Sequence, residues 1–188
     1  MTMTSPLAAF DRSITIFGCG TMAGAMLHRW LATGLVARHV TAIRQHPGTV
    51  APGMDAVTDA ADLPAPDILL IGIKPQQFAA LAPEIARLAG PDTLVLSILA
   101  GVPLERLHGA LPEAGAIVRL MPNLPVAEGR GIVARVGEAA AHGEALDALL
   151  APLGHVQPVG DEGEFDLVTA LAGCGPAFVY RFVAALSA

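Results

Sequence analysis

The chain has 188 residues, of which 53% are hydrophobic, so it is long enough to bury a substantial core. Its 11 basic and 17 acidic residues give a net charge of −6 with no cluster of Lys or Arg, which argues against a nucleic-acid partner. The first residues do not resemble a secretion signal and no apolar stretch has membrane-spanning length, so we expect a cytoplasmic protein without a membrane partner. Its two cysteines lie far apart and predict neither a disulfide framework nor a metal site.

Predicted strands and helices alternate along most of the chain. Residues 13–17 form an apolar, β-branched run that ends in a glycine, and residues 22–33 have helical spacing, which predicts a strand, a turn and a helix. The same patterns predict strands over 39–44, 68–73, 93–98 and 117–121, helices over 75–89 and 103–111, and a loop over 45–53. Strands over 131–136 and 155–159 then flank a helix over 139–150. These strands are expected to complete the sheet, with either parallel or antiparallel pairing at its edge.

This alternation predicts an α/β fold of the Rossmann type, with a mainly parallel sheet and helices on both of its faces. After position 160 the composition becomes helical and apolar, interrupted once by the Gly-Cys-Gly-Pro sequence at 173–176. We therefore expect an NADP-binding Rossmann domain over residues 1–160 and a helical segment over residues 161–188.

A glycine-rich loop joins the first predicted strand to the first helix and matches the G-x-G-x-x-G/A fingerprint of dinucleotide-binding proteins. The first glycine permits a tight turn, the second lets the backbone approach a pyrophosphate, and the small third residue lets helix and strand pack closely. Amides at the helix N-terminus then face the anion. The residues expected to bind the cofactor here are Gly18, Cys19, Gly20, Thr21, Met22 and Ala23.

The end of the second strand indicates which dinucleotide is bound. NAD-specific sites place an acidic residue there to bind the ribose 2′-hydroxyl, whereas this strand runs into Arg44, followed by Gln45 and His46. A cation with neutral donors suits a 2′-phosphate, so NADPH is the predicted cofactor and NADH the alternative. The competing interpretation is that Arg44 is a solvated loop residue.

Four further motifs, taken with the glycine loop, make the chain resemble the pyrroline-5-carboxylate reductase family. They are Ile73-Lys74-Pro75, Ser97-Ile98-Leu99-Ala100-Gly101-Val102, Arg119-Leu120-Met121-Pro122-Asn123 and the segment from Asp166 to Ala177. The resemblance implies reduction of the cyclic imine 1-pyrroline-5-carboxylate to L-proline by hydride transfer from NADPH or NADH. It also implies cofactor contacts at Ile73, Lys74, Pro75, Ala100 and Gly101, and at Asp59, where relatives often have an Asn.

The resemblance further implies substrate-side positions at Glu162, Gly175 and Pro176. Asn123 follows a predicted strand, where it is a candidate to hydrogen-bond the nicotinamide or the substrate; the competing interpretation is that it forms an ordinary turn before Leu124 and Pro125. The segment after residue 160 would be the first helices of a C-terminal domain that forms a homodimer or higher homo-oligomer. Relatives continue with further helices that contact the substrate, and no residue of this chain matches those positions. No catalytic acid or base is predicted, because the imine is readily protonated and the protein mainly positions the reactants.

Two other functions are compatible with the same motifs. One is an NADP-binding remnant that lacks catalysis because the substrate half is absent. The other is a β-hydroxyacid dehydrogenase, which would be expected to carry a catalytic Lys in its helical domain. No Lys follows Lys74 in this chain, so the second alternative ranks last.

Overall fold

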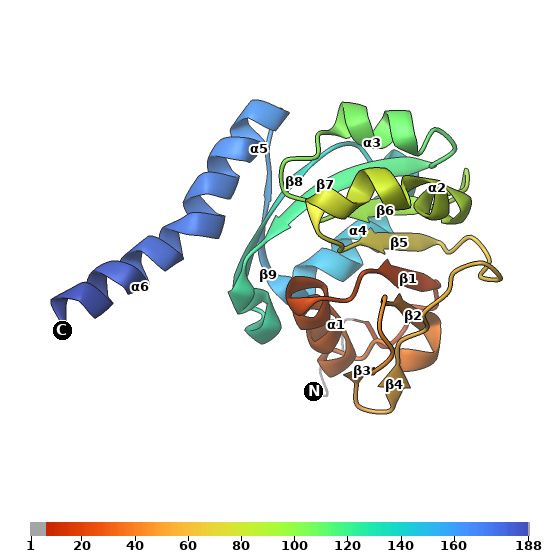
Figure 1. The fold of residues 1–188 in the computed structure, drawn as a ribbon, viewed down its shortest axis with the longest axis horizontal. Coiled ribbons are helices and arrows are strands. Elements are labelled where there is room, and N and C mark those ends of the chain that lie inside the picture. The colour runs from red at the N-terminus through yellow and green to blue at the C-terminus, as the bar shows by residue number, and fades with distance from the viewer. Residues whose placement is uncertain (1–6, 188) are drawn as a thin grey trace.

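The computed structural model describes residues 7–187, apart from the side chains of residues 140, 172–174 and 176. A seven-stranded sheet with the order β2-β1-β5-β6-β7-β8-β9 forms its centre (Figure 1). All neighbouring strands in this sheet are parallel except β7 and β8, which confirms the predicted fold class. The strands are β1 (Ile14–Phe17), β2 (Val40–Ile43), β5 (Ile68–Ile71), β6 (Leu94–Ser97), β7 (Ala116–Pro122), β8 (Gly131–Val136) and β9 (Gly154–Pro158).

Two hydrophobic cores lie on opposite faces of the sheet, because successive strand residues point to opposite sides. Ile14 and Ile16 of β1 belong to one core, and Phe17 belongs to the other. α1 and α4 supply helical residues to the first core, and α2 and α3 supply them to the second. These helices are α1 (Thr21–Ala32), α2 (Phe78–Leu88), α3 (Leu104–Ala110) and α4 (Gly143–Leu150), and short 3-10 turns lie at Ala37–His39, Pro75–Gln77, Leu124–Glu128, Ala140–His142 and Ala151–Leu153.

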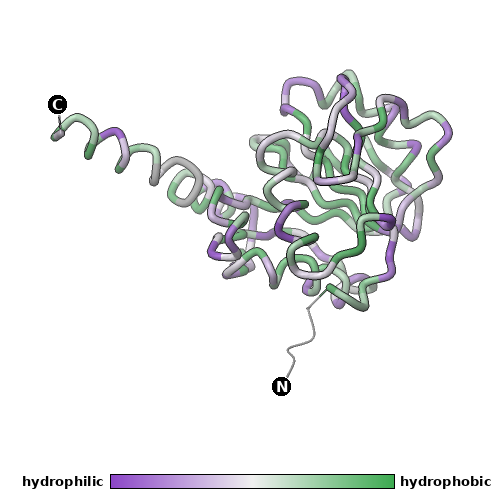
Figure 2. The backbone as a smooth tube through the Cα atoms, turned by 90° about the horizontal axis from the view of Figure 1, so that it is seen from below, coloured by the Kyte–Doolittle hydropathy of each residue, from purple (hydrophilic) through white to green (hydrophobic). Residues whose placement is uncertain are grey.

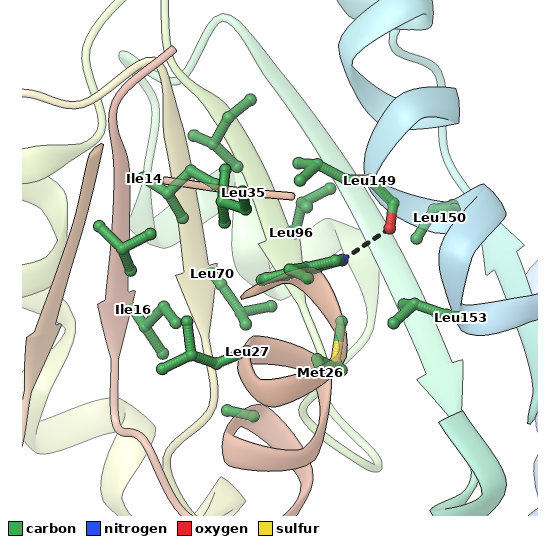
Figure 3. Close-up of a cluster of buried hydrophobic side chains, with 14 of the residues drawn as sticks. Ile14, Ile16, Met26, Leu27, Leu35, Leu70, Leu96, Leu149, Leu150 and Leu153 are labelled. Carbon is green, nitrogen blue, oxygen red and sulfur yellow. Dashed lines mark hydrogen bonds between the residues drawn. The ribbon is translucent and has the colours of Figure 1, made fainter. Parts of the chain in front are cut away.

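Trp30 is the largest fully buried side chain of the first core and joins α1 to α4. Its indole Nε1 donates a hydrogen bond of 2.7 Å to the carbonyl oxygen of Leu149, at the dashed line in Figure 3. Because this bond satisfies the polar atom of the indole, the ring can be buried without leaving an unpaired donor.

The predicted loop over 45–53 is partly wrong, because it contains β3 (Thr49–Ala51), which pairs antiparallel with β4 (Met54–Asp55). The apolar residues Val50 and Met54 are buried in the first core, and this burial stabilises the hairpin. The carbonyl oxygen of Val50 also lies 2.9 Å from Nε2 of His28 on α1. The hairpin is therefore held by tertiary packing that its Pro-Gly turn alone does not indicate.

The predicted interruption at 173–176 is also wrong. A π-helix over Thr169–Cys174 joins α5 (Glu162–Val168) directly to α6 (Gly175–Leu186), and the three segments form one arm that leaves the sheet (Figures 1 and 2). Pro176 is the second residue of α6, a first-turn position at which proline is tolerated, and the π turn that precedes α6 departs from the α-helical hydrogen-bond pattern. None of the described helices is long and apolar enough to cross a membrane.

Candidate dinucleotide site

The carboxyl ends of β1, β2 and β5 meet at one edge of the sheet, where a cavity of about 390 Å³ opens. In open α/β sheets a ligand binds at this edge, outside the strand ends. Six residues predicted to bind the cofactor line the cavity, namely Gly18, Cys19, Gly20, Arg44, Ile73 and Lys74. Segments that are distant in sequence are thus brought to one site by the parallel strand order.

The glycine loop has the geometry that its sequence predicts. Gly18 has φ +91°, and a methyl group on it would stand 2.5 Å from Cγ2 of Ile73. Around Gly20, in contrast, no heavy atom lies within 4 Å of the position that a Cβ would take. α1 begins immediately afterwards with no side-chain cap and no acidic residue in its first turn, so its amides can receive an anion.

Gly72 is part of the site but is absent from the sequence-based prediction, which placed it inside an unbroken strand. A methyl group there would stand 2.5 Å from the carbonyl oxygen of Gly18 and 2.9 Å from Cβ of Ala23. A glycine in a strand pattern often marks such a close approach of two backbones, and that signal was available in the sequence.

Arg44 supplies positive charge beside the glycine loop. It is half-buried at the end of β2 and lines the cavity with its neighbours Gln45 and His46. Burial raises the pKa of the Cys19 thiol, and the nearby Arg44 charge opposes part of that increase. The thiol is therefore neutral at physiological pH, and the cation remains available to an anionic ligand.

Lys74 and Glu84 bring opposite charges to the same cavity. Lys74 follows β5, and its backbone amide donates a hydrogen bond of 3.2 Å to Oε1 of Gln77 at the turn that precedes α2. Lys74 is exposed, so its ammonium group is solvated. Glu84 reaches the cavity from α2, which makes this wall less basic than the wall at Arg44.

The remaining residues predicted on the cofactor side lie outside this cavity. Thr58 lines the wall in place of Asp59, whose Oδ1 accepts a hydrogen bond of 2.8 Å from the amide of Ala61. Met22 and Ala23 pack into the first core, as the close contact of helix and strand requires. Thr21 lines a neighbouring cavity, Pro75 begins the turn before α2, and Ala100 and Gly101 are exposed beyond β6.

The residues predicted on the substrate side are not gathered at the cavity either. Oδ1 of Asn123 accepts a hydrogen bond of 2.9 Å from the amide of Ile132, which closes the connection between β7 and β8. Glu162 forms an ion pair with Arg119. Gly175 begins α6. The side chain of Pro176 lies outside the described residues.

No group of residues suited to a metal ion occurs within the described part of the chain. The fold and the glycine loop together define a Rossmann-type dinucleotide-binding protein. The family model described as "NADP oxidoreductase coenzyme F420-dependent" matches residues 13–101. The pyrroline-5-carboxylate reductase of Pseudomonas aeruginosa is 30% identical over 98% of this chain and 69% of that protein. The corresponding protein of Pasteurella multocida is 32% identical over 93% of this chain and 68% of its own length. The chain belongs to the pyrroline-5-carboxylate reductase family.

The structural comparison agrees with this assignment at the level of the fold. The crystal structure of the Plasmodium falciparum pyrroline carboxylate reductase with NADP bound superposes with a TM-score of 0.82 at 21% identity. The match covers 94% of this chain and 68% of that one. The uncovered share of this chain is shorter than the helical arm, so the similarity covers the sheet and reaches into the arm.

Proposed function

We propose that this chain reduces 1-pyrroline-5-carboxylate to L-proline with NADPH. The observation that carries the proposal is the cavity at the glycine loop, where Arg44 replaces the acidic residue of an NAD site. Membership of the reductase family supports the imine as the substrate. In the reaction a hydride is added to the imine carbon, a proton is taken up on nitrogen, and the C=N bond becomes a C–N bond.

The residues around the cavity fit a dinucleotide with a 2′-phosphate. The open space at Gly20 and the uncapped N-terminus of α1 would receive the pyrophosphate. Arg44 would pair with the 2′-phosphate, and Gln45 and His46 would donate hydrogen bonds to it. Reduced nicotinamide supplies the hydride when the cofactor is bound.

The protein's share of the chemistry is binding and orientation. The free imine is basic enough to be protonated readily, so no side-chain acid is assigned. Asn123, Gly175 and Pro176 remain proposed substrate-side residues, while the carboxylate of Glu162 is held by Arg119. Holding the two reactants close together and correctly oriented can by itself supply a large part of a rate acceleration.

We also propose that α6 associates with a second copy of the chain. Its large hydrophobic side chains from Phe178 onward are each more than half exposed, and its single charged residue is Arg181. Figure 2 shows this arm as a largely white and green tube that leaves the body of the protein. A helix that is apolar on most sides requires a partner in water. The exposed residues are Phe178, Val179, Tyr180, Phe182, Val183 and Leu186.

NADPH oxidation with 1-pyrroline-5-carboxylate, followed by absorbance and by detection of proline, tests the reaction. We expect oxidation that depends on the imine and proline formed in equal amount. NADPH binding without proline formation would contradict the reaction and favour the alternative of an NADP-binding protein without catalysis. Absence of NADPH binding would contradict the cofactor assignment as well.

A further inference from the structure

Arg119 is the one charged side chain that is fully buried in the described part of the chain, with 2% exposure. It lies on β7, paired in register with Ser97 of β6 and Val136 of β8. A buried guanidinium is expensive unless its donors are satisfied, and it contributes little to stability compared with apolar side chains. Its presence at this position therefore needs an explanation other than core packing.

Glu162, the first residue of α5, receives two hydrogen bonds on a single oxygen. Its Oε1 accepts from Nη1 of Arg119 at 2.5 Å and from the backbone amide of Leu104 at 2.9 Å. Leu104 is the first residue of α3 and directly follows the loop over 98–103. The carboxylate thus connects β7, the start of the helical arm and the end of that loop.

Phe165 fixes the other side of the guanidinium. Cζ of Arg119 lies 4.5 Å from the centre of the Phe165 ring, and the ring is fully buried beside Ala134 and Val136 of β8. A planar cation stacks well on an aromatic face, and Lys would not reproduce this contact. Arg119, Glu162 and Phe165 therefore form a clamp that ties the arm to the sheet.

The loop over 98–103 is the next segment along the edge that carries the cavity. The amide of Ile98 donates a hydrogen bond of 3.1 Å to the carbonyl oxygen of Ile71, and Cδ1 of Ile98 lies 3.5 Å from where a Cβ on Gly72 would be. Leu99 and Val102 are buried and anchor the loop, while Ala100 and Gly101 between them are exposed. A dinucleotide that starts at β1 and β2 extends along this edge toward β5 and β6.

We infer that Arg119 is a positioning residue, which acts through Glu162 to hold the loop over 98–103 against the nicotinamide half of the cofactor. The inference rests on the proposed function, because it takes the cavity to receive the adenosine half. It also links the direction of the helical arm to the geometry of this loop, since one carboxylate holds both.

Binding of two ligands by the whole chain tests this role. NADPH contains both halves of the cofactor, whereas adenosine 2′,5′-bisphosphate lacks the nicotinamide half. We expect Glu162→Ala to weaken NADPH roughly tenfold and to change the affinity for adenosine 2′,5′-bisphosphate by less than about twofold. Glu162→Gln keeps an oxygen that can accept from Leu104 and should bind NADPH within about threefold of the wild type.

Two further variants separate positioning from general destabilisation. Glu164→Ala is the matched control, because Glu164 also lies on α5 and accepts a backbone hydrogen bond, from Gly160 at 2.9 Å, but does not contact the loop. It should leave both affinities unchanged. Arg119→Met combined with Glu162→Ala removes both charges, so no buried cation is left unpaired, and it should reproduce the selective loss.

The possible outcomes distinguish this inference from the proposed function. Equal losses for both ligands, no loss for either, or the same result with Glu164→Ala would overturn the positioning role. If the wild type binds NADPH but does not reduce the imine, the proposed reaction fails and the comparison of ligands still decides the role of Arg119. If the wild type does not bind NADPH, the cofactor assignment and the inference both fail.

Discussion

Gly18 and Gly72 pack backbone against backbone at the ends of two adjacent parallel strands, β1 and β5. A methyl group on Gly72 would stand 2.5 Å from the carbonyl oxygen of Gly18, and a methyl group on Gly18 would stand 2.9 Å from the carbonyl carbon of Gly72. The glycine loop is therefore positioned by a second glycine that lies outside the recognised fingerprint. Neither position tolerates a side chain without movement of the loop.

Gly72→Ala should weaken NADPH binding at least about tenfold and lower the free energy of unfolding by about 1–3 kcal/mol, the usual cost of overpacking. Urea denaturation and fluorescence titration measure the two effects. Gly109→Ala is the control, because no heavy atom lies within 4 Å of its Cβ position in α3, and Ala favours the helix. Normal binding by Gly72→Ala would show that the loop has room to move.

Gly20→Val should abolish cofactor binding while the protein stays folded. No heavy atom of the protein lies within 4 Å of the position that a Cβ on Gly20 would take, and the φ of −87° is accessible to valine. The valine side chain should therefore clash with the bound cofactor and not with the protein. Circular dichroism and thermal melting check the fold, and NADPH titration checks the site. A folded variant with unchanged affinity would mean that the loop does not bind the pyrophosphate.

Arg44→Ala should reduce affinity for NADPH by about ten- to a hundredfold and leave that for NADH nearly unchanged. The reason is the loss of a charge-assisted hydrogen bond worth about 1.5–3 kcal/mol with the 2′-phosphate. Arg38→Ala, an exposed arginine outside the cavity, controls for net charge. Equal losses of affinity for NADPH and NADH would mean that Arg44 does not contact the 2′-phosphate.

Ser13→Ala should make stability less dependent on pH. The Ser13 hydroxyl and amide each donate a hydrogen bond of 2.7 Å to Oδ2 of Asp67, and the hydroxyl bond is the largest cause that lowers the pKa of that carboxyl. A lowered pKa in the folded state stabilises the protein above the unfolded pKa of about 3.9, and this contribution is lost as pH falls through the folded value. Because Asp67 is exposed, we expect an effect below about 1 kcal/mol.

Urea denaturation of Ser13→Ala at pH 7 and near pH 3 measures this difference. The variant should lose more stability relative to the wild type at pH 7 than at the acidic pH. In the background of Asp67→Asn, the cost of Ser13→Ala should be the same at both values. A cost that does not change with pH in the wild-type background would contradict the assignment.

Phe178→Ser combined with Phe182→Ser should reduce self-association of the chain. These rings are 71% and 65% exposed on α6, so their loss removes apolar surface that a second copy would cover. Light scattering over a range of concentrations reports the mass. Leu124→Ser, at a residue that is 63% exposed outside the arm, is the control and should not change association. An unchanged mass in the double variant would exclude this face as the interface.

The sequence alone predicted the parts of this protein that depend on short-range patterns. A glycine loop between an apolar strand and an amphipathic helix is a local signal, and so is Arg44 at the end of the next strand. The alternation of strands and helices was sufficient for the fold class, since parallel strands require crossover connections. Family relatives confirm the resemblance that the collinear motifs indicated.

Tertiary structure decided what depends on contacts between distant residues. Arg119 and Glu162 are 43 positions apart, and no local pattern pairs a strand arginine with the first residue of a helix. The Gly-Cys-Gly-Pro sequence predicted a helix break, but its first two residues belong to a π turn that continues directly into α6. A glycine within the apolar run at 68–73 signals a close approach of two backbones, but only the pairing of β1 with β5 shows that Gly72 meets Gly18. Local sequence patterns thus predict each helix and strand. The contacts between residues that are distant in sequence are determined only when these elements pack together.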